Sequence, residues 1–205
     1  GSINSTVSAN VDAGFSIVSY TGTGSAGTIG HGLSKQPELM LVKNRDKSWA
    51  WRVFVKDTTT ADGQVLTLNL ANAKETLGGG ATAWDVSEMS SSVIGIGSYG
   101  DVNNSGDDFI AYVFHSVDGY SKVGSYTGSG GTDGTFVYTG FRPAYVLIKR
   151  SNSSGQQAPI YDSARDTYNV AVHSIKSEDS AAEFTNQGTI DLLSNGFKAR
   201  NNEGS

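Results

Sequence analysis

The chain has 205 residues, a formal net charge of −5 and no cysteine, so it can form neither a disulfide framework nor a cysteine-based metal site. The acidic balance argues against a nucleic-acid partner, which needs a basic surface to neutralise phosphates, and no apolar run reaches membrane-spanning length. The 26 glycines are typical of a turn-rich chain, while 37% hydrophobic residues suffice for a packed core.

Short strand patterns separated by glycine-rich turns fill the first half of the chain. The predicted strands, in chain order, cover residues 15–20, 38–44, 49–56, 65–70, 93–97 and 109–115. The polar residues 101–106 are expected to form the tip of a hairpin between the last two strands, because asparagine and glycine tolerate tight turns. One short helical turn is expected over residues 71–77.

The second half repeats this plan. Its predicted strands cover residues 121–126, 135–138, 145–150, 159–162, 169–173 and 190–200, with one helical turn over residues 178–184. Many short strands at regular spacing predict an all-β, antiparallel β-sandwich of the jelly-roll type.

An internal repeat divides the chain. The block that begins at Ser19 returns at Ser125, and the apolar run after Pro37 returns after Pro143, both offset by 106 residues. A period this long indicates a duplicated domain rather than a solenoid repeat. We therefore expect two tandem antiparallel β-sandwich (jelly-roll-like) domains, residues 14–117 and residues 118–205, after an N-terminal segment or tag, residues 1–13.

The second copy is shorter than the first. In the first copy, an apolar strand pattern at residues 109–115 follows the turn Asn103-Asn104-Ser105-Gly106, whereas the matching turn of the second copy lies at the end of the sequence. The last strand of the second sandwich is therefore expected to be missing. Such a gap would leave an open sheet edge that invites a strand from elsewhere.

A weak calcium-loop pattern places oxygen ligands at alternate positions: Asp101, Asn103, Ser105 and Asp107. The twelfth position of the loop is Tyr112, where an EF-hand needs a bidentate glutamate, and the second copy has Ala199 in place of Asp101. An unoccupied polar turn is the favoured interpretation, and we predict no metal and no cofactor.

Aromatic side chains raise the alternative of carbohydrate binding. Trp49, Trp51 and Trp84 could stack on sugar rings, although tryptophans that alternate along a sandwich strand are more often part of the core. The second copy has no tryptophan at the position of Trp49 and Trp51. A tryptophan-based site would therefore belong to the first copy alone.

Catalytic patterns are weak, and we predict that the protein is not an enzyme. His31, His115 and His173 lack zinc-site spacing, so surface or capping roles are expected for them. No strand carries the closely spaced carboxylate pair typical of β-sandwich glucanases. Arg165 and Asp166 form the densest polar cluster of the second copy; an ion pair that closes a strand connection is favoured there, and ligand binding stays open.

The blocks at residues 14–22, 30–45, 119–128, 136–150 and 193–198 resemble a tandem domain found in marine bacteriophage structural proteins. The resemblance implies a non-catalytic virion module, in a tail fibre, an appendage or a capsid decoration, located in the extracellular phage particle. Its implied partners are other virion proteins or further repeats, a host-surface glycan, or a second copy of the chain, without membrane insertion. The resemblance assigns no binding residue.

A second functional class remains open. The alternative is a carbohydrate-binding module or a β-sandwich glycan hydrolase that uses carboxylates such as Glu38 or Asp101. Binding of a glycan without release of sugar would separate adhesion from hydrolysis.

Overall fold

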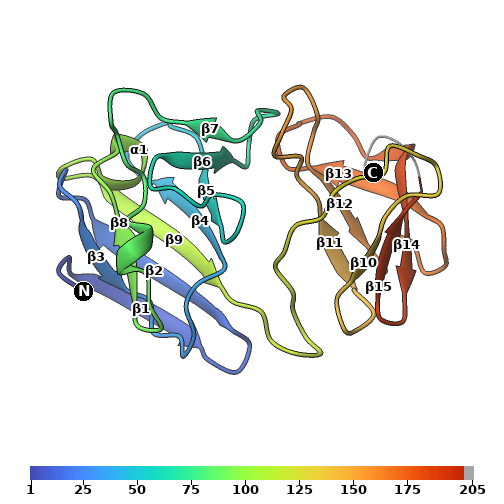
Figure 1. Ribbon diagram of the computed structural model, residues 1–205, viewed down its shortest axis with the longest axis horizontal. Coiled ribbons are helices and arrows are strands. Elements are labelled where there is room, and N and C mark those ends of the chain that lie inside the picture. The colour runs from blue at the N-terminus through green and yellow to red at the C-terminus, as the bar shows by residue number, and fades with distance from the viewer. Residues whose placement is uncertain (201–205) are drawn as a thin grey trace. The chain divides into compact units, whose positions relative to one another are not determined.

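The structure, a computed structural model, describes residues 1–200, apart from the side chains of residues 186–188. It confirms an all-β protein, with 38% of residues in strands and 4% in helices, and all its sheets are antiparallel (Figure 1). None of the helices described in residues 1–200 is both long and apolar enough to cross a membrane. The chain divides into two compact units: residues 1–68, 74–117 and 121–124 form unit 1, and the remaining described residues form unit 2.

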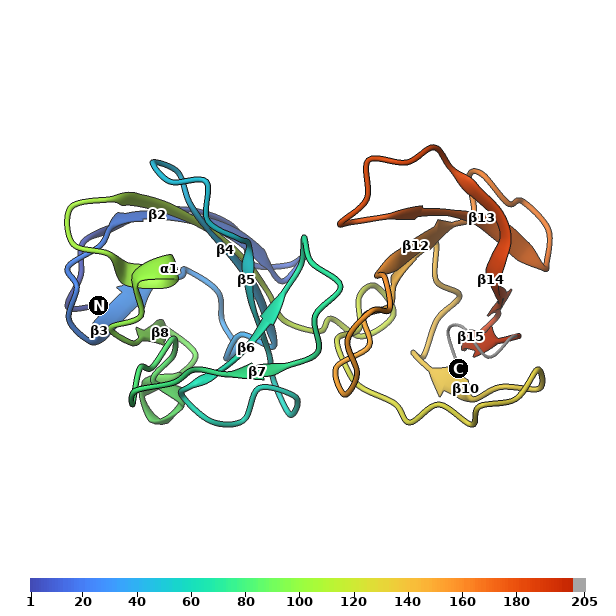
Figure 2. The ribbon, with the colours of Figure 1, turned by 90° about the horizontal axis from the view of Figure 1, so that it is seen from above.

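Unit 1 contains two antiparallel sheets. The larger sheet holds, in spatial order, β1 (Ser5–Asn10), β2 (Phe15–Thr21), β9 (Asp108–Phe114), β4 (Leu39–Asn44), β5 (Arg52–Val55), β6 (Gln64–Thr67) and β7 (Glu75–Thr76). The smaller sheet pairs β3 (Gly27–Gly30) with β8 (Val93–Ile96). Seen from above, β3, β8 and the short helix α1 (Gly100–Asn103) lie on the concave side of the larger sheet (Figure 2). A single 3-10 turn, η1 (Val86–Glu88), precedes β8.

Strand β9 is the centre of unit 1. It pairs with β2 from Phe15↔Phe114 to Thr21↔Asp108 and with β4 from Leu39↔Phe114 to Asn44↔Phe109. Its alternate residues Phe109, Ala111 and Val113 are fully buried, because period-two alternation turns them toward the second sheet. The prediction that residues 109–115 lie inside a sheet is confirmed.

Unit 2 contains one six-stranded sheet, which curls into a half-barrel. Its spatial order is β10 (Phe136–Tyr138), β15 (Gly196–Ala199), β14 (Phe184–Leu193), β13 (Ala171–Lys176), β12 (Pro159–Asp162) and β11 (Tyr145–Leu147). Its core is small and consists of Val146, Tyr161, Ala171, Ile190, Leu192 and Phe197.

Several predicted elements are wrong. Residues 71–77 hold β7 instead of a helical turn, and residues 178–184 form no helix. The predicted strand over residues 190–200 is a hairpin of β14 and β15. Residues 1–13 are not a separate segment, because β1 pairs with β2 along its whole length, from Ser5↔Tyr20 to Asn10↔Phe15.

The predicted hairpin around residues 101–106 is also wrong. Strand β8 pairs with β3, whereas β9 pairs with β2 and β4, so the connection crosses from one sheet to the other and carries α1. Sequence alone favoured a hairpin because two apolar runs flank an asparagine- and glycine-rich turn.

The predicted strand over residues 121–126 is absent, and only an isolated bridge between Val117 and Ser121 occurs there. In unit 1, the matching strand β2 is connected to β4 only through β9. The described residues of unit 2 contain no counterpart of β9. Without that partner, a segment with strand-like composition has no ladder to join.

Candidate functional site

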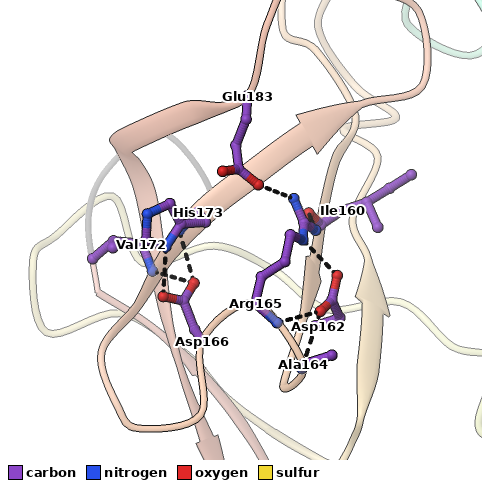
Figure 3. Close-up of polar contacts among 8 residues, drawn as sticks. All are labelled: Ile160, Asp162, Ala164, Arg165, Asp166, Val172, His173 and Glu183. Carbon is purple, nitrogen blue, oxygen red and sulfur yellow. Dashed lines mark hydrogen bonds and ion pairs between the residues drawn. The ribbon is translucent and has the colours of Figure 1, made fainter.

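The densest polar cluster of unit 2 surrounds the connection between β12 and β13 (Figure 3). β12 ends at Asp162, whose Oδ1 accepts hydrogen bonds from the backbone N–H groups of Ala164 (3.1 Å) and Arg165 (2.9 Å). Such a side-chain-to-backbone turn is the usual reason for an aspartate at the end of a strand. It brings the Arg165 side chain back toward β12.

Arg165 donates hydrogen bonds to three acceptors. Its guanidinium donates to Asp162 Oδ2 (2.6 Å), to Glu183 Oε1 (3.0 Å) and to the carbonyl oxygen of Ile160 (2.9 Å). The sequence suggested that Arg165 would pair with its neighbour Asp166, but its partners are Asp162 and Glu183. The hydrogen bonds from Arg165 and the turn hold the pKa of Asp162 below its usual range.

Asp166 belongs to a second group, with His173. Its Oδ2 accepts the backbone N–H groups of Val172 (2.9 Å) and His173 (2.8 Å), and its Oδ1 accepts from His173 Nδ1 (2.7 Å). The register of β13 against β14 shifts between Ala171 and His173, and Asp166 binds two N–H groups at this irregularity. The carboxylate therefore caps a bulge that the ladder leaves without regular pairing.

Asp166 and His173 shift each other's pKa in opposite directions. Burial opposes ionisation of Asp166, but the hydrogen bonds from the imidazole and the backbone outweigh it and lower the pKa of this carboxyl. The hydrogen bond to Asp166 in turn raises the pKa of His173. The pair resembles the aspartate–histidine part of a catalytic triad, in which the carboxylate fixes the ring tautomer.

A nucleophile is missing from this arrangement. Among the residues that the structure describes, no hydroxyl group bonds to His173 Nε2. Nor do residues 1–200 contain a group of three or more His, Asp or Glu side chains placed to hold a metal ion. The cluster can fix the β12–β13 connection and offer a half-exposed imidazole to a ligand, but it shows no complete catalytic constellation.

The tryptophan candidates do not form one site. Trp84 is fully buried, packs edge-on against Phe54 (5.8 Å between ring centroids) and donates its indole N–H to the carbonyl of Gln64 (2.9 Å). It is a core residue and cannot stack on a sugar. Trp51 is half-buried and stacks against Tyr112, with centroids 6.1 Å apart, while Trp49 is half-buried and lies beside Gly100.

The calcium-loop candidates are dispersed as well. The carboxylate of Asp101 accepts a hydrogen bond from Arg52 Nε (2.7 Å). The Asn103 amide is buried and binds the backbone of Thr23 and Gly97. Ser105 is exposed. Asp107 Oδ2 accepts from Asn44 (2.8 Å) and Asn104 (2.9 Å), so the four predicted ligands serve separate structural contacts.

Surface or capping roles were expected for His31 and His115. The surface role is wrong for both, whereas a capping role fits His31, whose Nδ1 accepts the backbone N–H of Leu33 (3.2 Å). His31 is fully buried; its Nε2 contacts the Ser90 carbonyl (3.2 Å), and burial lowers its pKa. His115 is also buried, with Nδ1 2.9 Å from the Ser116 carbonyl. Glu38, the candidate hydrolase carboxylate, accepts hydrogen bonds from the Ser116 backbone and hydroxyl. His173 has a carboxylate partner, Asp166, which lies seven residues earlier in the sequence. No known motif spacing links these two positions, so the sequence did not reveal the pair.

Fold and cluster together define an all-β, antiparallel protein of two compact units with a polar strand connection in the second. The chain belongs to the family described as "Domain of unknown function (DUF7483)", whose sequence model matches residues 1–205. Comparisons with curated proteins and with solved structures returned no match.

Proposed function

We propose that the protein is a non-catalytic module of a bacteriophage virion, in a tail fibre, an appendage or a capsid decoration, built from two tandem antiparallel sandwiches. Its work is structural, and it includes recognition of the host surface. One observation carries the proposal: two strand pairings of unit 1 recur in unit 2. The pairing of β4 with β5 recurs as β11 with β12, and that of β3 with β8 recurs as β10 with β15.

The repeated pairs match in detail. Met40↔Phe54 in unit 1 corresponds to Val146↔Tyr161 in unit 2, and both valine and methionine positions follow a proline by three residues. A duplicated sheet module can be extended in series, which suits a fibre or a coat. The virion setting itself rests on the sequence resemblance to phage structural proteins.

The carboxylates support a non-catalytic role. Glu38 is bound by Ser116, Asp101 by Arg52 and Asp162 by Arg165. A general acid or base needs a side chain directed at a substrate, and these three are directed at protein groups. The cluster around Asp166 lacks a nucleophile among the described residues, as shown above.

Exposed aromatic side chains favour glycan recognition as a second function. In unit 2, Tyr138, Tyr145 and Tyr168 have exposed fractions of 66%, 58% and 85%. Exposed tyrosine faces suit stacking on pyranose rings because they offer large apolar area with little conformational entropy to lose. If the protein binds glycans, these tyrosines are better candidates than the tryptophans.

Two experiments test the proposal. Immunogold labelling of virions, from a phage that encodes a chain of this family, should decorate the particle; label confined to infected-cell extract would contradict the virion role. A glycan array, with a parallel assay for released reducing sugar, tests the activity. Binding that weakens in Tyr138→Ala or Tyr168→Ala but not in the matched Tyr120→Ala variant supports recognition, and release of sugar would overturn the non-catalytic role.

A further inference from the structure

We propose that the outer face of strands β10, β15 and β14 in unit 2 binds a neutral pyranose ring of a glycan. Phe136 and Tyr138 form the stacking platform, and the ion pair of Lys198 with Asp133 supplies hydrogen bonds to the sugar hydroxyl groups. This inference rests on the glycan-recognition part of the proposed function, and it assigns that recognition to one surface and one class of sugar.

The strand register places the platform residues side by side. Phe136 of β10 lies opposite Lys198 of β15, and Tyr138 lies opposite Gly196. Val137, between the two rings, packs against the core of unit 2, so period-two alternation turns both rings to the outer face. Phe136 has an exposed fraction of 43%, and Tyr138 is more exposed still. The edge of this sheet therefore carries two neighbouring aromatic rings that are open to a ligand.

A glycine shapes the platform. A Cβ atom at Gly196 would lie 3.0 Å from Cε2 and Cζ of Phe136 and 2.1 Å from the Val137 carbonyl oxygen, so a side chain does not fit there without a shift. The Phe136 ring therefore lies against the backbone of β15, and it contributes to the burial of Gly196. A ring in this position presents its face, and the face of an aromatic ring is the part that packs on the C–H groups of a pyranose.

Charged side chains border the platform. Lys198 Nζ forms an ion pair with Asp133 (2.5 Å), and Arg200 Nε forms one with Asp191 (2.7 Å), which lies opposite Lys198 in the ladder. Two cations and two carboxylates balance, so this surface suits a neutral ligand better than an acidic or basic one. Because an ammonium group can donate three hydrogen bonds, Lys198 can bind Asp133 and a sugar hydroxyl group together.

Unit 1 indicates that strand pairing does not require the two rings. β3 corresponds to β10, and its buried Ile29 takes the place of Val137 in the pairing with the next strand. The neighbours of Ile29 are Thr28 and Gly30, where β10 has its aromatic residues. β3 pairs with β8 along its whole length without an aromatic side chain. Contact with a ligand accounts for the rings of unit 2 better than the fold does.

The probes are the methyl glycosides of glucose, galactose and mannose, added to the isotope-labelled 205-residue chain and followed by NMR. Because a single sugar ring offers little contact area, the titration runs to about 50 mM. We expect saturable binding of at least one probe, with amide shifts concentrated at residues 136–138 and 196–198. Ring protons on one face of the bound sugar should shift upfield, since they lie over an aromatic face. Because the probes are uncharged, the dissociation constant should change by less than about twofold between low and high salt.

Variants locate the site. Tyr138→Ala should weaken binding at least tenfold, and Lys198→Met, which keeps the stem of the side chain, should weaken it about fivefold. The matched control is Tyr120→Ala, at another exposed tyrosine of unit 2, and it should leave binding within about twofold. The amide spectrum of each variant shows whether the fold is retained.

Four results would overturn the proposal: no saturable binding of any probe, amide shifts at other strands, full binding by Tyr138→Ala, or binding of acidic sugars alone. A glycan array separates this failure from that of the proposed function. If the array shows bound glycans whose affinity depends on Tyr145 or Tyr168 and not on Tyr138, glycan recognition stands and the β10–β15–β14 site is rejected. If the array shows no bound glycan and the probes do not bind, both fail.

Discussion

Tyr20 and Phe109 stack face to face in the core of unit 1, with ring centroids 5.2 Å apart and planes inclined by 12°. The Tyr20 hydroxyl also donates to the carbonyl oxygen of Val102, at 2.6 Å, and burial raises the pKa of this phenol. The stack joins β2 to β9, and the hydrogen bond joins β2 to α1. A single side chain of β2 thus connects this strand to two later elements that are distant from it in sequence.

Removal of the Tyr20 hydroxyl should destabilise unit 1 moderately. Tyr20→Phe keeps the stack but leaves the buried Val102 carbonyl without this donor, which costs about 1–2 kcal/mol. Phe109→Ala removes a fully buried ring from the central strand and should cost about 3–5 kcal/mol. Urea denaturation measures both values. Tyr168→Phe, at an exposed position, is the control and should change stability by less than about 0.5 kcal/mol; equal effects of all three would contradict the role of the stack.

Sequence patterns predicted those strands whose own residues alternate between buried and exposed positions. The alternation of Phe109, Ala111 and Val113 gave a strand inside a sheet, and β12 matches its prediction at both ends. Residues 121–126 failed for a non-local reason, because a strand forms only where a neighbour completes its ladder. The dependence on residues outside the local pattern is also the reason why the polar cluster around Arg165, Asp166 and His173 was not predicted from the sequence. Asp166 contacts His173 at an irregularity in strand pairing, and Arg165 forms its ion pair with Asp162 instead of its sequence neighbour Asp166.

The Arg52 network should contribute strongly to stability. The guanidinium donates to Asp101 (2.7 Å), Thr67 (2.8 Å) and Tyr99 (3.1 Å), with little solvent access. Arg52→Met preserves much of the packing but leaves the Asp101 carboxylate without its cation, so we expect a loss of about 2–3 kcal/mol. The matched control is Asp133→Asn, which breaks the ion pair of the exposed Asp133 with Lys198. A smaller drop in melting temperature for Arg52→Met than for this control would contradict the assignment.

Calcium should not stabilise the protein. Asp101 is paired with Arg52, and Asn103 directs its amide at backbone groups, so neither oxygen is available to complete a calcium shell. We expect the melting temperature to be the same in EDTA and at about 5 mM calcium, a concentration above the dissociation constants of weak extracellular sites. A calcium-dependent rise that disappears in Asp107→Asn would show that the loop rearranges to bind the ion.

The Asp166–His173 pair should make stability depend on pH with a definite sign. The pKa of His173 is raised in the folded state, so its contribution is complete below about 6.5 and is lost as the pH rises through the raised value. The pKa of Asp166 is lowered, so its contribution is present above about 3.9 and is lost as the pH falls through the lowered value. The stabilisation is therefore largest between these limits.

The His173→Gln variant tests this pair. Its melting temperature should fall below that of the wild type most clearly between about pH 4 and 6.5, and the two curves should converge at alkaline pH, where the wild-type ring is neutral. Glu183 favours the charged ring and Arg165 opposes it, and both residues remain when Asp166 is replaced by asparagine. In an Asp166→Asn background, the same substitution should produce little pH dependence. If His173→Gln lowered the melting temperature with the same pH dependence in the Asp166→Asn background as in the wild type, a group other than Asp166 would be responsible.

Substitution of Asn103 should lower the stability of unit 1 strongly, because this small side chain forms three hydrogen bonds. Its Oδ1 accepts the N–H of Thr23 (2.8 Å), and its Nδ2 donates to the carbonyls of Ser25 (2.7 Å) and Gly97 (2.8 Å). The side chain is fully buried, so no water replaces a lost partner readily. It fastens the turn after β2 to the connection between β8 and α1.

Asn103→Ala should therefore cost about 3 kcal/mol, because one donor and two acceptors of the backbone lose their partner. Asn103→Asp retains the bond from Thr23 but places a carboxylate against two carbonyl oxygens, and it should be at least as destabilising at neutral pH. That variant should recover stability as the pH falls toward 4, since protonation restores one donor. Asn104→Ala, one residue further on, removes one hydrogen bond to Asp107 and is the matched control. Urea denaturation across this pH range measures all three variants, and an acid-independent Asn103→Asp would contradict the assigned donor role of the amide.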